Sequence, residues 1–218
     1  MGDSKERRFW DKISEKYAAD PIKDMESYEH KLEMTRGCFT PESTVLEFGC
    51  GTGGTALLHA PFVKHILATD FSGEMLRIAE TRKAEAGVEN VTFRQARLED
   101  IDPATDGPFD VVMGMSILHL VRDRAETLAR ARDLLKPGGR LVTSTVCLGD
   151  GFWFLIPIIP IAQALGLFPV LRVFGAKRLN QDMQDAGFEI TYEWRPGPSK
   201  ALFLVARKPA ASSGSQSA

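Results

Sequence analysis

The sequence predicts an α/β fold whose β-sheet is mainly parallel and carries helices on both faces. From Ser43 onward, short apolar runs alternate with amphipathic stretches of about a dozen residues, which is typical of βαβ units. A glycine-rich turn follows the first of these runs directly. The last third departs from the alternation and ends in two short strands joined by a Pro/Gly turn, which predicts an antiparallel hairpin.

Residues 5–35 precede the sheet and are expected to form two amphipathic helices. Apolar side chains recur at spacings of three or four within 9–17 and again within 25–32, and Pro21 lies between the two stretches.

The remaining elements follow in chain order, and turn or cap signals mark their boundaries. Ser72 is a candidate N-cap for a helix that reaches Gly87. A second helix is expected over 125–135, before the Pro/Gly stop signal at 136–139, and a third over 179–187. Strands are expected at 44–48, 65–69, 91–94, 109–115, 140–146, 188–194 and 201–207.

Composition limits the classes of function. The 218 residues (24.1 kDa) are 44% hydrophobic and 26% charged, which is ordinary for one globular domain. The net charge of -2 offers no basic excess for a phosphate backbone, so no nucleic-acid partner is expected. The three cysteines form no CxxC pair, which argues against a disulfide framework or zinc ribbon. The charged N-terminus lacks an apolar signal segment, so a cytoplasmic location is expected, and residues 209–218 are expected to be a disordered tail.

One long run, residues 151–171, has no charged side chain. Its 21 residues could cross a bilayer, but Pro157, Pro160 and Pro169 interrupt it, and it lies between elements of one sheet. We therefore interpret residues 151–178 as an apolar lid insertion. Contact of residues 151–171 with a membrane surface stays open as an alternative.

The glycine-rich turn has the sequence EFGCGTGG at 47–54. Glycines at 49, 51 and 53 let the backbone turn sharply and approach a ligand without a Cβ in the way. The helix that follows offers unpaired N–H groups at its first turn. Gly49, Gly51 and Gly54 also match GxGxxG, the dinucleotide fingerprint, which is a weak signal by itself.

Two carboxylates near this turn bear on the ligand. Glu47 lies two residues before the first glycine, beside the place of a pyrophosphate, and like charges there are costly in a partly buried site. A cation with an α-amino group and a sulfonium, such as S-adenosylmethionine (SAM), is favoured instead. Asp70 closes the second strand and can accept both ribose hydroxyls, which suits either a dinucleotide or SAM.

These motifs resemble those of the class I SAM-dependent methyltransferases, and the resemblance covers roughly residues 40–208. It implies a Rossmann-like seven-stranded sheet of order 3-2-1-4-5-7-6 with only strand seven antiparallel. It also implies that residues 1–40 form a helical cap over the active site and that residues 41–208 form the SAM-binding domain. The matching segments occur in the family's order: VLEFGCGTG at 45–53, ATDFSGEML at 68–76, FDVV at 109–112 with Leu118-His119, LLKPGGRL at 134–141, and Ala186-Gly187-Phe188.

The resemblance implies a set of contacts to SAM, or to its product S-adenosylhomocysteine (SAH). Arg97 departs from the family, which commonly has an acid there that binds the adenine amino group. A guanidinium cannot accept from that group but can stack on the ring, and the Leu98 N–H can still serve the ring. The expected cofactor contacts are Tyr17, Glu47, Gly49, Cys50, Gly51, Gly53, Asp70, Phe71, Met75, Arg97, Leu98 and Met115.

His119, Tyr28 and His30 are the candidate catalytic residues. His119 follows the fourth predicted strand, where the family's acceptor pocket opens, and a near-neutral pKa would suit a general base or a substrate ligand. Its leucine neighbours are typical of the alternative, a buried structural histidine. Tyr28 and His30 could orient the methyl acceptor, although aromatic residues at helical spacing also serve packing. Cys147 and the histidines at 59 and 65 are interpreted as structural, and no metal site is predicted.

Methyl transfer from a sulfonium is an in-line displacement, so the protein must hold the acceptor atom about 3–3.5 Å from the methyl carbon and exclude water. The absence of an NPPY-like segment at 113–116 argues against amino groups of DNA bases or protein glutamine. We expect a small, hydrophobic or thiol-bearing acceptor and a monomer or homodimer. The alternatives are a membrane-surface enzyme that methylates a lipid headgroup and a non-catalytic SAM-binding module.

Overall fold

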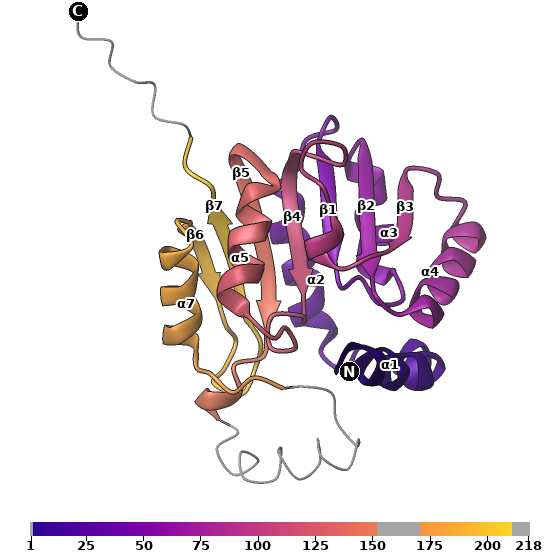
Figure 1. Cartoon of the computed structure of the whole chain (residues 1–218), viewed down its shortest axis with the longest axis horizontal. Helices are drawn as coiled ribbons and strands as arrows, with labels where there is room; N and C mark the ends of the chain where they lie inside the picture. Colours follow the sequence, from indigo (N-terminus) through magenta and orange to yellow (C-terminus); the bar gives the residue numbers. More distant parts are fainter. Residues whose placement is uncertain (1, 152–170, 211–218) are drawn as a thin grey trace, which may run out of the picture.

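Seven strands form one sheet in the order β3-β2-β1-β4-β5-β7-β6 (Figure 1), which confirms the predicted order. The structure is a computed structural model that describes residues 2–151 and 171–210. β1 pairs in parallel with β2 and β4, and β7 is antiparallel to both β5 and β6. The strands are β1 (Thr44–Phe48), β2 (His65–Asp70), β3 (Val91–Gln95), β4 (Phe109–Met115), β5 (Leu135–Thr145), β6 (Glu189–Trp194) and β7 (Leu202–Arg207).

Helices cover both faces of the sheet. In Figure 1, α5 and α7 lie in front of the sheet, α2 and α3 lie behind it, and α4 lies beside β3. α1 crosses the end of the sheet to which the parallel strands point. The helices are α1 (Gly2–Ala19), α2 (Met25–Arg36), α3 (Gly54–His59), α4 (Gly73–Ala86), α5 (Arg124–Asp133) and α7 (Ala176–Asp185), with short 3-10 turns η1 (Ala60–Phe62), η2 (Leu98–Asp100) and η3 (Leu148–Asp150).

Each face of the sheet has its own apolar core. On one side, Leu128 of α5 and Leu179 of α7 are almost fully buried against the sheet. On the other side, Ala56 of α3 packs with Val45 and Phe203. Burial on both faces explains why the central strands are continuous apolar runs rather than alternating ones.

The predicted cap signals of α4 are confirmed. The Ser72 side chain accepts a hydrogen bond from the Met75 N–H at 3.2 Å, and Gly87 ends the helix in the left-handed region with φ 62°. Both devices satisfy backbone groups that have no partner within the helix.

The predicted boundary between the second helix and the fifth strand is wrong. α5 ends at Asp133, and β5 begins at Leu135 rather than at 140. Leu135 already pairs with Phe109, the Gly138 N–H donates to the carbonyl of Lys208 just after β7, and the Lys208 N–H donates to the Gly139 carbonyl. The Pro/Gly segment therefore forms an irregular first part of the strand, because a neighbouring strand supplies partners that the local sequence does not reveal.

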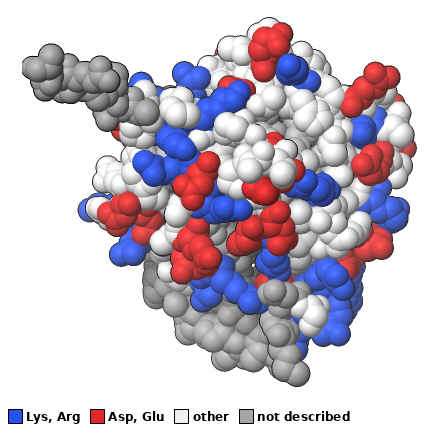
Figure 2. Space-filling model, turned by 45° about the horizontal axis from the view of Figure 1, so that its top comes forward, with Lys and Arg blue, Asp and Glu red and all other residues white. Residues whose placement is uncertain are grey.

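Most of the predicted lid, residues 152–170, lies outside the described residues, as do residues 211–218 of the predicted tail. α7 begins at Ala176, two residues inside the predicted end of the lid at 178. Among the residues that the structure describes, no helix combines the length and the hydropathy needed to cross a bilayer. On the face shown in Figure 2, acidic and basic side chains are interspersed.

Candidate active site

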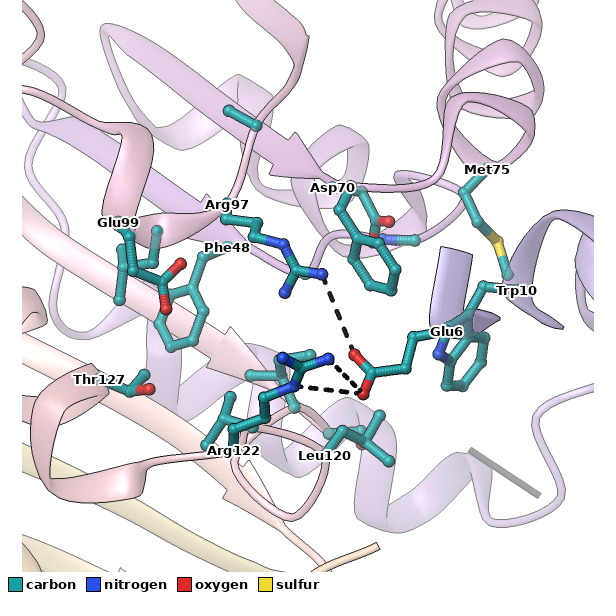
Figure 3. Close-up of a pocket in the computed structure, with 18 of the residues that line it drawn as sticks. Glu6, Trp10, Phe48, Asp70, Met75, Arg97, Glu99, Leu120, Arg122 and Thr127 are labelled. Atoms are coloured by element: carbon teal, nitrogen blue, oxygen red, sulfur yellow. Dashed lines mark hydrogen bonds and ion pairs between the residues drawn. The ribbon is translucent and has the colours of Figure 1, made fainter. Parts of the chain in front are cut away.

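A cavity of about 380 Å³ lies at the carboxyl ends of β1, β2, β3 and β4 (Figure 3). Residues at the end of each of these strands line it, and α1 contributes a further wall through Glu6, Trp10 and Tyr17. The order of the strands reverses between β1 and β4, and ligands of open α/β sheets bind at such a switch point.

The glycine-rich turn after β1 forms the floor of this cavity through Gly49 and Gly51. Gly49, Gly51 and Gly53 all have positive φ, which a side chain disfavours. A Cβ on Gly53 would lie 2.6 Å from Phe93 Cζ, whereas a Cβ on Gly54 would meet nothing within 4 Å. A dinucleotide turn needs its third glycine, here Gly54, for close helix–strand packing. The packing requirement therefore falls on Gly53, which fits the methyltransferase-like pattern better than GxGxxG.

Asp70 at the end of β2 is fixed by backbone donors from two sides. Its carboxylate accepts from the Gly51 N–H and the Ser72 N–H, both at 2.9 Å. Ser72 in turn donates its hydroxyl to Asp11 of α1 at 2.6 Å. Burial raises the pKa of Asp70, and the two backbone hydrogen bonds oppose that rise. Asp70 therefore joins the glycine-rich turn, α4 and α1, with its carboxylate on the cavity wall.

Glu47 lies behind the turn and does not line the cavity. It is 2% exposed, and its Oε2 has no hydrogen-bond partner among the described residues. Burial and the nearby Asp70 carboxylate raise its pKa to about 8. A buried carboxyl oxygen without a partner is costly, so Oε2 is a candidate acceptor for a donor or cation.

Tyr17 of α1 and Tyr28 of α2 approach this pair of acids. Tyr17 lies over the turn, because a Cβ on Gly51 would be 3.8 Å from its Cε1. Burial raises the pKa of its hydroxyl, and Asp70 and Glu47 raise it further, although 49% of the residue is exposed. Burial also raises the pKa of Tyr28, with Glu47 contributing, but Tyr28 does not line the cavity.

An ion-pair triad spans the cavity on the β3 side. Arg97 lies over the Phe71 ring at 4.7 Å, and its Nη2 is 3.9 Å from Glu6 Oε2. Arg122, which precedes α5, approaches the same Glu6 carboxylate at 3.2 Å. Figure 3 shows both guanidinium groups directed toward Glu6. The triad links α1 to the connections after β3 and β4.

Ser116 and Ile117 form the wall at the end of β4. Ser116 has φ 57°, and it is the one non-glycine residue with positive φ in the part of the chain that the structure describes. Its N–H donates to the Ser144 carbonyl at 2.7 Å, which helps to hold this disfavoured conformation. Ile117 then packs on Gly49, where a Cβ would come within 2.8 Å of it. The end of β4 thus sets the position of the turn after β1.

His119 and His30 do not line the cavity. Burial lowers the pKa of His119 to about 4, so the expected near-neutral pKa is wrong and the imidazole is neutral at pH 7. Its Nδ1 has no partner within the described ranges. His30 Nε2 is 3.0 Å from the Tyr192 hydroxyl, and its ring packs on Trp194 at 4.3 Å, which anchors α2 to β6.

Cys147 and His59 do not line the cavity, and burial disfavours the charged form of each. Burial raises the pKa of Cys147 to about 11 and lowers that of His59 to about 4. Within the described ranges, no group of three or more His, Cys, Asp or Glu side chains converges as metal ligands would.

The structure brings nine of the twelve expected cofactor contacts together on the cavity wall. The other three do not line the cavity: they are Glu47, just before the glycine-rich turn, and Cys50 and Gly53 within it. The nine are Tyr17, Gly49, Gly51, Asp70, Phe71, Met75, Arg97, Leu98 and Met115.

Sequence reasoning did not find the other lining residues. Those at strand ends could have been found from the strand boundaries alone, whereas those on α1 and before or within α5 depend on tertiary packing. They are Glu6, Trp10, Phe48, Ala96, Glu99, Ser116, Ile117, Leu120, Val121, Arg122, Asp123, Glu126 and Thr127.

Comparison with known proteins agrees with this geometry. The family model described as a methyltransferase domain matches residues 45–139, from β1 to the start of β5. A DhpI–SAH complex superimposes with a TM-score of 0.72 over 96% of this chain and 98% of that chain, at 23% identity. At this identity the likeness shows that the two chains share a fold.

Two curated relatives are similar to part of the chain. A ubiquinone biosynthesis O-methyltransferase of Xylella fastidiosa (strain 9a5c) is 35% identical over 102 residues, which cover 47% of this chain and 41% of the relative. The uncharacterized methyltransferase YcgJ of Bacillus subtilis (strain 168) is 34% identical over 101 residues, covering 46% of this chain and 40% of YcgJ. The matched part of this chain thus spans about two-fifths of the length of these relatives.

Proposed function

We propose that this chain binds SAM in the cavity and catalyses transfer of its methyl group to a small acceptor by in-line displacement. One observation carries the proposal: the buried Glu47 carboxyl, whose Oε2 has no partner among the described residues, lies behind a glycine-rich turn and close to Asp70. An ammonium would pair with the ionised form of Glu47, whereas a pyrophosphate would meet the negative charge of Asp70 and keep Glu47 protonated, so this pair of acids favours a ligand with an ammonium group.

The residues present fit SAM, which supplies an activated methyl group on a sulfonium. The turn at 49–51 lets the amino-acid part of the ligand approach the backbone closely, and Glu47, buried behind that turn, attracts its ammonium when the carboxyl is ionised. Asp70 accepts hydrogen bonds from the ribose hydroxyls. Cys50 and Gly53 shape that turn from behind. On the remaining walls Phe71, Met75, Leu98 and Met115 supply apolar contacts, Arg97 a stacking surface, and Tyr17 covers the turn.

We propose residues 1–40 as a helical cap on this site. α1 reaches the cavity through Glu6, Trp10 and Tyr17, and the Asp11–Ser72 hydrogen bond ties the helix to the end of β2. A helix in this place excludes water from the reacting atoms, which displacement requires.

The acceptor is proposed to be small and either hydrophobic or thiol-bearing. Ile117, Leu120 and Val121 give the wall after β4 an apolar character, and the Ser116 hydroxyl is a polar group among them. His119 would be a weak base with a pKa of about 4, so an acceptor that needs little base catalysis, such as a thiolate, is favoured. Tyr28 and His30 stay candidates for orienting the acceptor from α2.

Calorimetry and a turnover assay test the proposal together. The purified chain should bind SAH and SAM, whereas NAD should bind weakly or not at all, because its pyrophosphate would lie beside Asp70 and could not pair with Glu47. Release of SAH should then be followed with a panel of small thiols, phenols and other hydroxyl compounds, the last because a relative is named an O-methyltransferase. Tighter binding of NAD than of SAH would overturn the assignment of the cofactor.

The same assay separates the two alternatives. A lipid-headgroup methyltransferase would show turnover on lipid vesicles and co-sediment with them. Its sequence basis, residues 151–171, lies almost entirely outside the described residues. A non-catalytic SAM-binding module would bind SAH yet release none from SAM with any acceptor of the panel.

A further inference from the structure

Polar contacts join α1 to α4. The two helices pack against each other, yet within residues 4–19 only one residue is buried, and it is a serine. Asp11 accepts a hydrogen bond from Ser72, the N-cap of α4, at 2.6 Å, and Glu15 pairs with Arg77. Because so little of α1 is buried, these polar contacts have a large part in setting its position over the cavity.

Arg82, near the end of α4, makes a third contact with α1 and also reaches the glycine-rich turn. Its Nη2 donates to the Ala18 carbonyl at 2.8 Å, and its Nη1 donates to the Thr52 hydroxyl at 2.7 Å. Ala18 lies in the last turn of α1, where a carbonyl has no partner within the helix. Because a guanidinium is planar and holds its donors in a fixed fork, this Arg82 bridge fixes the separation between the end of α1 and the turn.

The residue that the Arg82 bridge places is Tyr17, which immediately precedes Ala18. The Tyr17 ring lies over the glycine-rich turn, with its Cε1 3.8 Å from the position of a Cβ on Gly51. Tyr17 is 49% exposed, and its ring meets Trp10 of the same helix edge-on at 6.2 Å. With half of the residue in solvent, packing alone does not hold the ring at this height, so the anchored backbone beside it has to.

Arg77 offers a comparison on the same two helices. It pairs with Glu15 of α1 and with Glu74 of α4, and its side chain is 54% exposed. Among the described residues it makes no hydrogen bond to the glycine-rich turn, and an exposed pair of this kind contributes little. The two arginines therefore separate attachment of α1 to α4 from attachment that also includes the turn.

We propose that Arg82 is a positioning residue for cofactor binding, which acts by holding Tyr17 at a fixed distance above the glycine-rich turn. The inference rests on the proposed function, in which Tyr17 covers that turn over bound SAM. Arg82 itself does not line the cavity, so its effect on a ligand has to pass through Tyr17. Loss of the bridge should then have the same consequence as loss of the Tyr17 ring.

A double-mutant cycle, measured with SAH by calorimetry, tests this role. Arg82→Met keeps the apolar stem and removes every donor, and it should weaken SAH binding about three- to tenfold. Tyr17→Ala should weaken it at least as much. Effects do not add when one residue acts through the other, so the double variant should bind SAH no more weakly than Tyr17→Ala alone. Arg82→Lys, which keeps a charged donor, should restore part of the affinity, and Arg77→Met should bind like the wild type.

A second measurement needs no ligand. Burial raises the pKa of the Tyr17 hydroxyl, and the neighbouring Asp70, Glu47 and Tyr28 raise it further. Titration of tyrosinate absorbance, with Tyr17→Phe to assign the signal, should give a lower pKa in Arg82→Met than in the wild type, because the ring moves away from these groups. Removal of a nearby positive charge would by itself raise this pKa, so a fall reports movement of the ring.

Thermal unfolding shows whether each variant folds. If Arg82→Met does not, Thr52→Val, which removes the hydroxyl at the other end of the bridge, should show the same loss of SAH affinity. Additive effects in the cycle, or an unchanged Tyr17 pKa in Arg82→Met, would overturn the inference and leave the proposed function standing. Equal losses of affinity in Arg77→Met and Arg82→Met would indicate general detachment of α1 and would also overturn it.

Failure of the wild-type chain to bind SAH would overturn the proposed function and, with it, the role of Arg82 in binding. The two failures are distinguishable, because the Tyr17 titration uses the unliganded protein and shows separately whether Arg82 holds the ring.

Discussion

The two sides of the cavity are built in different ways. The side made by the turn after β1 and the end of β2 relies on backbone: three glycines with positive φ and an Asp70 carboxylate held by two backbone N–H groups. The side made by α1 and the connections after β3 and β4 relies on long charged side chains: the side chains of Arg122 and Arg97 are 47% and 34% exposed, and that of Glu6 is 15% exposed. Glu47 and Asp70, by contrast, are 2% and 7% exposed.

This difference implies that the β1–β2 side of the cavity is rigid and that the side with the Glu6–Arg97–Arg122 triad is more adjustable. A buried turn that a single methyl group would disrupt tolerates little change, and any charge on the acids beside it acts at low dielectric. Exposed ion pairs contribute little to stability and weaken in salt. We therefore expect substitutions on the β1–β2 side to have large effects on folding and binding, and substitutions in the triad to act mainly on rates.

The largest effect is expected for Gly53→Ala. Its φ of 76° costs an alanine about 1–2 kcal/mol, and the new Cβ would lie within 2.6 Å of Phe93, an overpacking that costs about 1–3 kcal/mol more. Chemical denaturation should show a loss of about 2–5 kcal/mol in the free energy of unfolding.

Two glycines of the same chain separate these contributions. Gly138 has φ 80°, and a Cβ there would meet no neighbour. Gly138→Ala should therefore lose only the backbone-strain contribution, about 1–2 kcal/mol of the free energy of unfolding. Gly54→Ala, with open space and no positive φ, should be close to neutral. If Gly54→Ala proved as harmful as Gly53→Ala, the packing argument against a dinucleotide turn would fail.

The next effect concerns the carboxylate at the end of β2. Asp70→Ala should weaken SAH binding by about 1–3 kcal/mol, because a charge-assisted acceptor for the ribose is lost. Asp70→Asn keeps one acceptor oxygen, so its dissociation constant for SAH, measured by calorimetry, should lie between those of the wild type and Asp70→Ala. An unchanged dissociation constant in Asp70→Ala would remove Asp70 from the cofactor site.

A pH dependence should follow from Glu47. Its pKa in the folded, unliganded protein is about 8, so the carboxyl is mostly neutral at pH 7 and must ionise to pair with an ammonium. SAH affinity should therefore rise between about pH 6.5 and 8.5, by at most about tenfold per pH unit. Glu47→Gln should flatten this profile, and a steep profile retained in that variant would contradict the assignment.

The raised pKa of Glu47 should also make the stability of the unliganded protein fall with rising pH, whereas the affinity for SAH rises. Because the folded carboxyl holds its proton to a higher pH than the unfolded one, the folded state binds more protons between about pH 4.5 and 8. The free energy of unfolding of the unliganded protein should then lose this contribution as pH rises through that window. Saturating SAH should offset the loss, because the ligand supplies the missing partner.

The contrast between the two sides also explains what the sequence could predict. The turn at 47–54 and Asp70 are local signals: a glycine must be where φ is positive, and an acid that closes a strand lies at the sheet edge. The strand order came from the resemblance to a family rather than from spacing. Glu6 and Arg122, by contrast, lie 116 residues apart and meet only because α1 folds back across the strand ends.

Two of the predicted site residues show the limit of reasoning from position alone. His119 follows β4 as expected, yet burial rather than exposure to the cavity sets its pKa. His30 lies on α2 at helical spacing, and the aromatic residues of β6 that hold it could not be paired with it from periodicity.

The smallest effect is expected in the triad, and it should appear in a rate. Glu6→Gln removes a charge shared by Arg97 and Arg122, which should loosen the start of α1 and speed the release of SAH about two- to fivefold at low salt. Stopped-flow fluorescence can follow release, because Trp10 lies on the cavity wall. In about 0.5 M salt the variant and the wild type should converge, since exposed pairs are screened there. Glu15→Gln is the matched control: it lies on the same helix and also pairs with an arginine, Arg77 of α4, but neither residue lines the cavity. If both variants accelerated release equally, general fraying of α1 would explain the effect, and the triad would have no special role in retaining the ligand.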